Sequence, residues 1–207
     1  MPDEEQIRVR VTARYMDNYM LASIAHHQLA MARQEKDGYR FRWLIPCMAI
    51  SVFRLESLCN QYGVQLFDRW DQMTNNMSFR SKITKISEHL GLQPNYQREP
   101  WASIARMIKF RNLLAHSKMV EVSEELTVRS IEQALILSYP EPREGSVFRD
   151  YSSLQNAERF HEIVSRLDSR WAYQARLNRQ DIDRVGGRRL ERVVHDEQGN
   201  PRYEPIE

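Results

Sequence analysis

The 207-residue chain is poor in cysteine and in the residues that make turns. Its two cysteines, Cys47 and Cys59, fall in a segment that we expect to be one helix, which would hold them about 18 Å apart and beyond the reach of a disulfide. Only seven glycines and eight prolines are present, and so few turn residues favour long regular elements. A chain without expected disulfides is typical of a reducing compartment.

Long apolar runs are also missing. No stretch approaches the roughly 18 apolar residues of a membrane-spanning helix. The N-terminal segment MPDEEQIRVR opens on acidic residues and lacks the apolar region of a secretory signal. We therefore expect a cytoplasmic protein that has no membrane partner.

The composition nevertheless provides material for a core. Hydrophobic residues make up 42% of the chain, four tryptophans among them, and charged residues make up 28%, which is an ordinary balance for a globular protein. Helix-forming residues dominate, and runs of β-branched residues are short. We predict an all-α fold, an antiparallel bundle of four or five helices with a helical C-terminal extension.

Capping and turn residues divide the chain into expected helices. Ser78 is suited to cap a helix, Gly91 to end it, and Pro100 to occupy the first turn of the next one. Gly63 is interpreted as a helix stop, and Pro46 as a residue that lies in the first turns of its helix or kinks it. The expected helices cover about residues 12–36, 39–62, 78–90, 101–118, 124–138 and 153–179.

The C-terminal region is predicted to contain a long helix followed by a polar tail. Its apolar residues recur at a heptad-like spacing that fits packing against the bundle or against a second subunit. They are Ala157, Phe160, Val164, Leu167 and Trp171. The polar tail contains two short strand-like segments, 192–194 and 202–203, which could form a small hairpin. The expected domains are a bundle over 1–145, a candidate dimerisation helix over 146–185, and a tail or hairpin over 186–207.

Charge is unevenly distributed along the chain. Residues 77–118 contain eight Lys or Arg and two acids, a balance of +6, whereas residues 119–146 contain two and six, a balance of −4. Arginine outnumbers lysine by 25 to five, and its planar guanidinium binds phosphate in a bidentate manner. The basic segment is therefore a candidate nucleic-acid surface or, equally, the solvated face of a helical protein. The candidate phosphate contacts are Arg80, Lys82, Lys85, Arg106, Lys109 and Lys118.

The helix expected from Trp101 carries the residues best suited to chemistry. Its apolar residues form two stripes, which indicates burial on both sides, within the bundle or between subunits. Arg111, Asn112 and His116 lie at its C-terminal end. Asn112 and His116 share a face, whereas Arg111 lies about 140° from His116. Histidine can transfer a proton near neutral pH, and arginine can stabilise the charge that builds on a phosphate under attack.

This arrangement, an Arg-Asn pair followed by His four residues later at the end of a late helix, resembles the motif of HEPN domains. The resemblance covers about residues 15–138. It implies a metal-independent endoribonuclease that needs no cofactor and leaves 2′,3′-cyclic phosphate and 5′-OH ends. It further implies a homodimer whose two motifs face each other, in a toxin or phage-defence system that holds an antitoxin or another defence partner.

Two further positions matter for this resemblance. Glu56, on the apolar helix upstream, resembles the polar residue that some HEPN members place opposite the motif, although a Glu there is also a common ion-pair partner. Asn60, one turn later, is interpreted as structural. Some members carry a Tyr two residues after the His, which an antitoxin modifies; Lys118 stands there in this chain, so control by that route is not expected.

Two other interpretations stay open. The chain could be a catalytically inactive helical module that binds protein or nucleic acid, or a purely structural subunit. In those cases His116 is a histidine at a helix C-terminus, favoured there by the helix dipole, and Arg111 is a surface ion-pair residue. No metal site is expected, because the adjacent His26 and His27 point about 100° apart on a helix.

Overall fold

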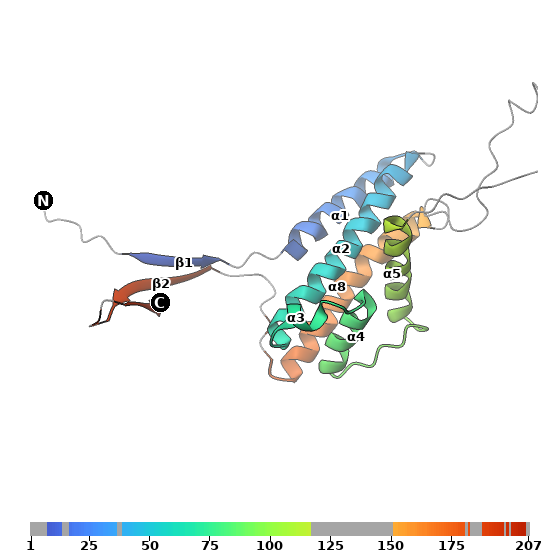
Figure 1. The fold of residues 1–207 in the computed structure, drawn as a ribbon. Coiled ribbons are helices and arrows are strands. Elements are labelled where there is room, and N and C mark those ends of the chain that lie inside the picture. The colour runs from blue at the N-terminus through green and yellow to red at the C-terminus, as the bar shows by residue number, and fades with distance from the viewer. Residues whose placement is uncertain are drawn as a thin grey trace, which may run out of the picture.

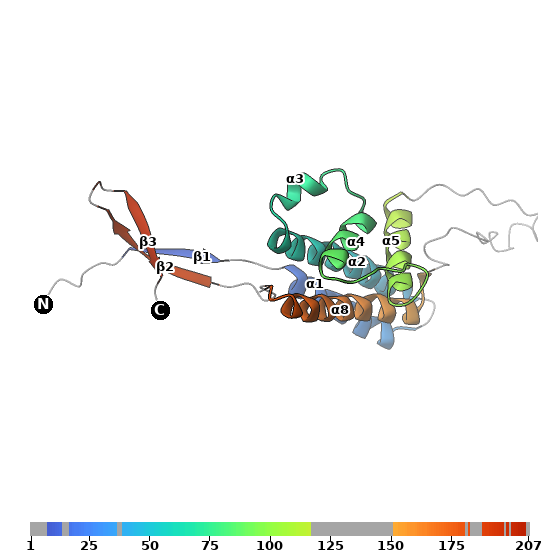
Figure 2. The ribbon, with the colours of Figure 1, turned by 90° about the horizontal axis from the view of Figure 1, so that it is seen from below.

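The computed structural model describes residues 8–13, 17–36, 39–116, 151–180, 182, 188–196, 198 and 200–205. The helix expected over residues 124–138 and the candidate Lys118 lie outside these ranges. Within them, a helical bundle forms the larger part, and a small antiparallel sheet lies beyond one end of it (Figures 1 and 2).

The described helices confirm the predicted mainly α-helical class. Five of them contain eleven or more residues, and α3 is a short connecting helix. Their bounds are Asp17–Gln34 for α1, Phe41–Leu66 for α2, Trp70–Thr74 for α3, Phe79–His89 for α4, Trp101–Ala115 for α5 and Leu154–Leu177 for α8. None of the described helices combines the length and the apolar character that crossing a membrane requires.

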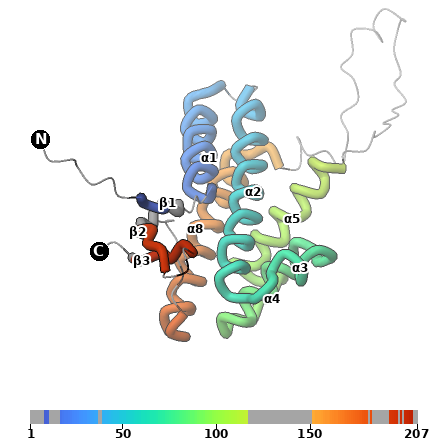
Figure 3. Tube along the Cα trace, turned by 60° about the vertical axis from the view of Figure 1, so that its left-hand side comes forward, coloured from blue at the N-terminus to red at the C-terminus, as the bar shows by residue number. Residues whose placement is uncertain are grey.

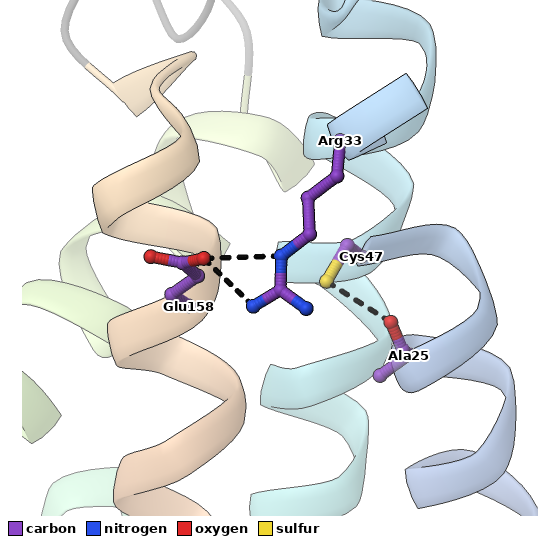
Figure 4. A network of polar contacts seen from close by, with 4 residues as sticks. All are labelled: Ala25, Arg33, Cys47 and Glu158. Atoms are coloured by element: carbon purple, nitrogen blue, oxygen red, sulfur yellow. Dashed lines mark hydrogen bonds and ion pairs between the residues drawn. The ribbon is translucent and has the colours of Figure 1, made fainter. Parts of the chain in front are cut away.

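Helices α1 and α2 form an antiparallel pair, which Figure 3 shows side by side. Near one end of the pair, Arg54 Nε donates to Asn18 Oδ1 at 3.0 Å. Further along, the Cys47 thiol donates to the carbonyl of Ala25 at 3.3 Å (Figure 4). Burial raises the pKa of Cys47 to about 11, and both cysteines are free, as the sequence predicted.

Helix α8 completes the core by packing against both members of this pair. Arg33 of α1 forms an ion pair of 2.8 Å with Glu158 near the start of α8 (Figure 4). Arg54 donates to Ser165 at 2.9 Å. About two turns further along α2, Tyr62 donates to Asp168 at 3.0 Å. The contacts thus advance in the same direction along both helices, and α2 and α8 run parallel to each other.

The apolar stripe of α8 faces the bundle. The heptad-like spacing of the stripe allowed packing against either the bundle or a second subunit. Trp171 is fully buried, its ring lies 5.1 Å from that of Tyr62, and its Nε1 donates to Ser87 Oγ at 3.1 Å. The other residues of the stripe are buried as well: Ala157, Phe160, Val164 and Leu167. Ser153 caps the helix by accepting from the backbone N–H of Asn156.

The expected start of the first helix was wrong. Residues Val9–Ala13 form strand β1, and α1 begins only at Asp17. β1 pairs antiparallel with β2 (Arg188–His195), which pairs antiparallel with β3 (Pro201–Pro205). The hairpin predicted for the tail is therefore present, and a strand from the other end of the chain adds to it. The alternation Ile-Arg-Val-Arg-Val over residues 7–11 is the strand signal that was overlooked.

Gly63 does not end its helix, contrary to the prediction. α2 continues through it to Leu66, and the indole of Trp70 packs against the glycine. A Cβ atom at position 63 would lie 2.1 Å from Trp70 Cε2, so this glycine allows a close approach. Pro46 lies within the first turns of α2, as one of its two interpretations required.

The boundaries of α4 were predicted correctly. Ser78 Oγ accepts from the Ser81 backbone N–H, and Gly91 follows the helix with a φ of +80°, where its missing side chain avoids strain. Pro100 occupies the N-cap of α5 rather than the first helical position. Its helix nevertheless begins at Trp101, as predicted.

Candidate functional site at the end of helix α5

Helix α5 buries one continuous face, where the sequence predicted two separate apolar sides. Trp101, Ile104, Met107 and Phe110 recur every three residues and are all buried. Leu114, near the end of the helix, is 38% exposed. The helix is thus fixed to the bundle along one side and open to solvent along the other.

The three motif residues lie where α5 ends. The backbone N–H of His116, the residue after the helix, donates to the carbonyl of Asn112 at 3.0 Å. Asn112 and His116 are exposed, whereas Arg111 is half-buried and its Nη1 lies 3.5 Å from Asn112 Oδ1. Among the described residues, no hydrogen bond joins Arg111 to His116. The motif therefore presents an imidazole and an amide to solvent, and the guanidinium of the half-buried Arg111 lies beside that amide.

Lys109 belongs to the same solvent-facing side of α5. At about 100° per residue it lies within about 60° of both Asn112 and His116, and all three are exposed. Among the candidate phosphate contacts that the structure describes, Lys109 is therefore the closest in position to the motif. Its flexible ammonium provides a positive charge without fixed geometry.

The start of α8 packs against the end of α5 (Figure 1). The ring of Phe110 lies 5.2 Å from that of Tyr151 and 5.6 Å from that of Phe160. Arg106, another candidate phosphate contact, places its Cζ 5.2 Å above the Tyr151 ring. This aromatic cluster holds the last two turns of α5 in place and thereby positions the motif.

Glu56 lies on the side of α2 that faces α4. Burial raises the pKa of the Cys59 thiol, the Glu56 carboxylate raises it further, and Lys82 of α4 lowers it, so both charges are close to this cysteine. No hydrogen bond or ion pair links Glu56 to the motif residues among those described. Asn60 accepts from Trp70 Nε1 at 3.5 Å, which agrees with its interpretation as structural.

The candidate phosphate contacts on α4 occupy two different flanks of that helix. Arg80 places its Cζ 4.0 Å above the ring of Tyr96, in the segment between α4 and α5. Lys85 places its Nζ 5.4 Å above the ring of Phe67, which follows α2. Lys82 shares the flank of Lys85, since the two are three residues apart. The sequence predicted one basic surface, and the structure divides it between these flanks and the exposed side of α5.

A second basic feature escaped the sequence interpretation. An open groove of about 590 Å³ lies between the start of α5 and the middle of α8. Three exposed arginines of α8 line it, Arg159, Arg166 and Arg170. Glu99 and Glu162 also line it, and Glu162 forms an ion pair with Arg166. The sequence contained a signal for this groove, because spacings of seven and four residues place the three arginines on one side of α8, beside its apolar stripe.

A buried polar network joins α1, α2 and α8 and was also not predicted. Its centre is Arg54, which is 6% exposed and bonded to Asn18 and Ser165. Burial lowers the pKa of Arg54, and the nearby Asp168 carboxylate opposes that shift. Because each hydrogen-bonded group has a partner on another helix, the network fixes how the three helices align.

His161 lies beside this network, with its ring 5.9 Å from that of His26. Its Nδ1 is buried without a hydrogen-bond partner. Burial lowers its pKa, and the charges of Arg54, His26 and Arg33 lower it further. Across the described ranges, no three His, Cys, Asp or Glu side chains gather as a metal-ligand set.

Comparisons of the chain with protein-family models, with curated proteins and with solved structures found no match.

Proposed function

We propose that the protein is a HEPN-like endoribonuclease that cuts RNA without a metal ion, within a toxin or phage-defence system. The observation that carries the proposal is the arrangement at the end of α5. Asn112 and His116 are exposed there on the same side as Lys109, and Arg111 lies next to them in sequence. These are the residue types that phosphodiester cleavage by an internal hydroxyl requires.

In the proposed reaction, the ribose 2′-OH loses its proton to an imidazole and its oxygen attacks the adjacent phosphorus. The bond from phosphorus to the 5′-oxygen breaks, and that oxygen takes a proton from a general acid. The products are a 2′,3′-cyclic phosphate and a 5′-OH, so protons and electrons balance without an added reactant. Arg111 stabilises the additional negative charge on the phosphorane, and Lys109 holds the neighbouring phosphate.

A homodimer supports this chemistry better than a single chain does. The reaction needs both a base and an acid, and each motif contains one histidine. Two motifs that face each other across a two-fold axis would supply both histidines. A solution mass that corresponds to a monomer at micromolar concentration would contradict the composite site.

The test is cleavage of end-labelled RNA in EDTA by wild type, Arg111→Ala and His116→Ala. We expect each substitution to slow cleavage by about a hundredfold or more, because each removes a general acid–base group or the phosphorane contact. The new ends should be cyclic phosphates.

Two matched substitutions serve as controls. His27→Ala removes another exposed histidine, and Arg176→Ala removes an arginine from the last turn of α8. Both should cleave at the wild-type rate, and all variants should unfold at the same temperature. Equal cleavage by all five proteins, or none by wild type, would refute the proposal.

The groove beside α8 favours a second candidate function, a catalytically inactive module that binds nucleic acid. Arg159 and Arg170 offer phosphate contacts away from the motif, whereas Arg166 forms an ion pair with Glu162. Under this alternative, Arg170→Gln weakens RNA binding and reduces its salt dependence, while His116→Ala leaves affinity unchanged. An RNA affinity that does not depend on Arg170 would exclude it.

A further inference from the structure

The three-stranded sheet gathers exposed arginines around an exposed tyrosine. Residues directly opposite each other in antiparallel strands point to the same face. Val193 of the central strand β2 lies opposite Tyr203 of β3. Its backbone N–H donates to the carbonyl of Arg8, which directly precedes β1, the neighbouring strand on the opposite edge of β2. By this register Arg8, Arg10, Glu191, Val193, His195 and Tyr203 share one side of the sheet, which we call the tyrosine face.

Tyr203 and Arg10 form the centre of this face. The Cζ of Arg10 lies 4.4 Å above the ring of Tyr203, and the tyrosine is still 43% exposed. Arg8 and His195 are exposed as well. The arginine therefore covers part of the ring, and the rest faces solvent.

The charge of the strands identifies the kind of partner. The three strands contain five arginines and two glutamates, a balance of +3 over both faces of the sheet. The register places Arg8, Arg10, Arg189 and Glu191 on the tyrosine face, which therefore keeps a positive excess of two. An accessible ring flanked by guanidinium groups is suited to stack a nucleobase while its arginines contact the neighbouring phosphates. A second copy of the same face would be repelled by its charge, and an acidic peptide would not use the ring.

We propose that the tyrosine face binds single-stranded RNA and holds the substrate while the end of α5 cuts it. The choice of RNA as the ligand rests on the ribonuclease function proposed above. The sheet joins the bundle before α1 and after α8, whereas the motif lies near the start of α8. The 24 residues of α8 span about 36 Å, so the tyrosine face contributes to affinity and takes no part in bond breaking.

The test measures binding of a fluorescent single-stranded RNA of 20 nucleotides to the full chain that carries His116→Ala, so that the RNA stays intact. In this background, Tyr203→Ala should raise Kd at least about fivefold, because one stacked base is lost. Tyr203→Phe keeps the ring and should stay within about twofold. Arg10→Gln should raise Kd and make log Kd less steep against log salt.

Tyr173→Ala is the matched control, because Tyr173 is an exposed tyrosine, 61% accessible, that belongs to helix α8 and not to the sheet. It should bind RNA as the background protein does. Equal Kd values for Tyr203→Ala and the background would overturn the proposal. So would a fall in affinity for Tyr203→Phe as large as that for Tyr203→Ala, since the hydroxyl rather than the ring would then matter.

Competition identifies the class of ligand. Unlabelled single-stranded RNA should displace the probe, and polyglutamate of equal charge should not; displacement by polyglutamate would show a general anion site and overturn the proposal. Cleavage distinguishes the two proposals. If wild type cuts RNA but Tyr203→Ala binds normally, only the role of the sheet fails. If binding depends on Tyr203 but no RNA is cut, only the proposed catalysis fails.

Discussion

The helical bundle and the three-stranded sheet use their side chains in different ways. In the bundle, large side chains such as Trp70, Phe160 and Trp171 are buried, and each helix packs against α2, α8 or both. In the sheet, Val9 and Tyr203 are about half exposed, and backbone pairing joins the strands. Packing therefore constrains the residues of the bundle core, whereas the exposed residues of the sheet are available for binding.

This comparison predicts where substitutions matter for folding and where they matter for function. A change in the bundle core should destabilise the protein, because it opens a cavity or breaks a buried hydrogen bond. A change on the tyrosine face should affect ligand binding and leave the unfolding of the bundle unchanged, because surface substitutions cost little.

The largest effect on stability is expected from Trp171→Ala. The substitution removes a fully buried indole and its hydrogen bond to Ser87, and should cost about 3–5 kcal/mol. Urea unfolding followed by circular dichroism at 222 nm measures this loss. Trp171→Phe should cost less, since it leaves a smaller cavity. A loss below about 1 kcal/mol for Trp171→Ala would contradict the packing of α8 into the core.

A smaller loss is expected from Gly63→Ala. The new methyl group would meet the indole of Trp70, so the ring must move, at a cost of about 1–3 kcal/mol. Without this clash, Gly63→Ala would stabilise the helix by about 1 kcal/mol. The sign of the change in the free energy of unfolding therefore shows whether the clash is present. Replacing both residues, as Gly63→Ala with Trp70→Leu, should remove the clash. Stabilisation by Gly63→Ala alone would show that Trp70 does not pack there.

These cases show what sequence could predict in the fold. Local signals placed Ser78, Gly91 and the start of α5 correctly, because caps and turns are decided within a few residues. Gly63 was misinterpreted because its role depends on Trp70, a contact that no local pattern reveals. β1 was missed because its partner strand lies near the opposite end of the chain, although its alternation was visible in the sequence.

The candidate site was predictable to a similar extent. Sequence placed Arg111, Asn112 and His116 at the end of a helix, and the helix does end at Ala115. It did not predict that the basic residues separate onto different flanks, that α8 lines a groove of arginines, or that Arg54 is buried between helices. Those features depend on which elements pack together, which short-range spacing does not determine.

The pH dependence of stability should differ between wild type and His161→Gln. Folding lowers the pKa of His161 from its usual 6.5, chiefly through burial, so the unfolded chain binds a proton more readily. The contribution to stability is therefore complete above pH 6.5 and decreases as the pH falls below it. Urea midpoints at pH 7.5 and 5.5 should diverge more for wild type than for His161→Gln. If the urea midpoint changes equally between the two pH values in both proteins, the ring is solvated in the folded state.

The smallest effect on folding is expected from Tyr203→Ala. The ring lies on the exposed sheet, so the free energy of unfolding of the bundle should change by less than about 0.5 kcal/mol. The matched change in the core, Tyr62→Ala, removes a buried ring that packs on Trp171, and should cost about 3–5 kcal/mol. Equal losses for the two tyrosines would show that the sheet and the bundle unfold as one packed unit.

The central claim is that the end of α5 cuts RNA through the 2′-OH without a metal ion. The most direct test uses one RNA oligonucleotide that wild type cuts in EDTA and the same oligonucleotide with a single 2′-deoxy nucleotide at the cleaved position. We predict that wild type cuts the first, leaves the second intact at that position, and loses activity on the first through His116→Ala. Cleavage of the 2′-deoxy substrate at the same bond, or undiminished cleavage by His116→Ala, would contradict the account.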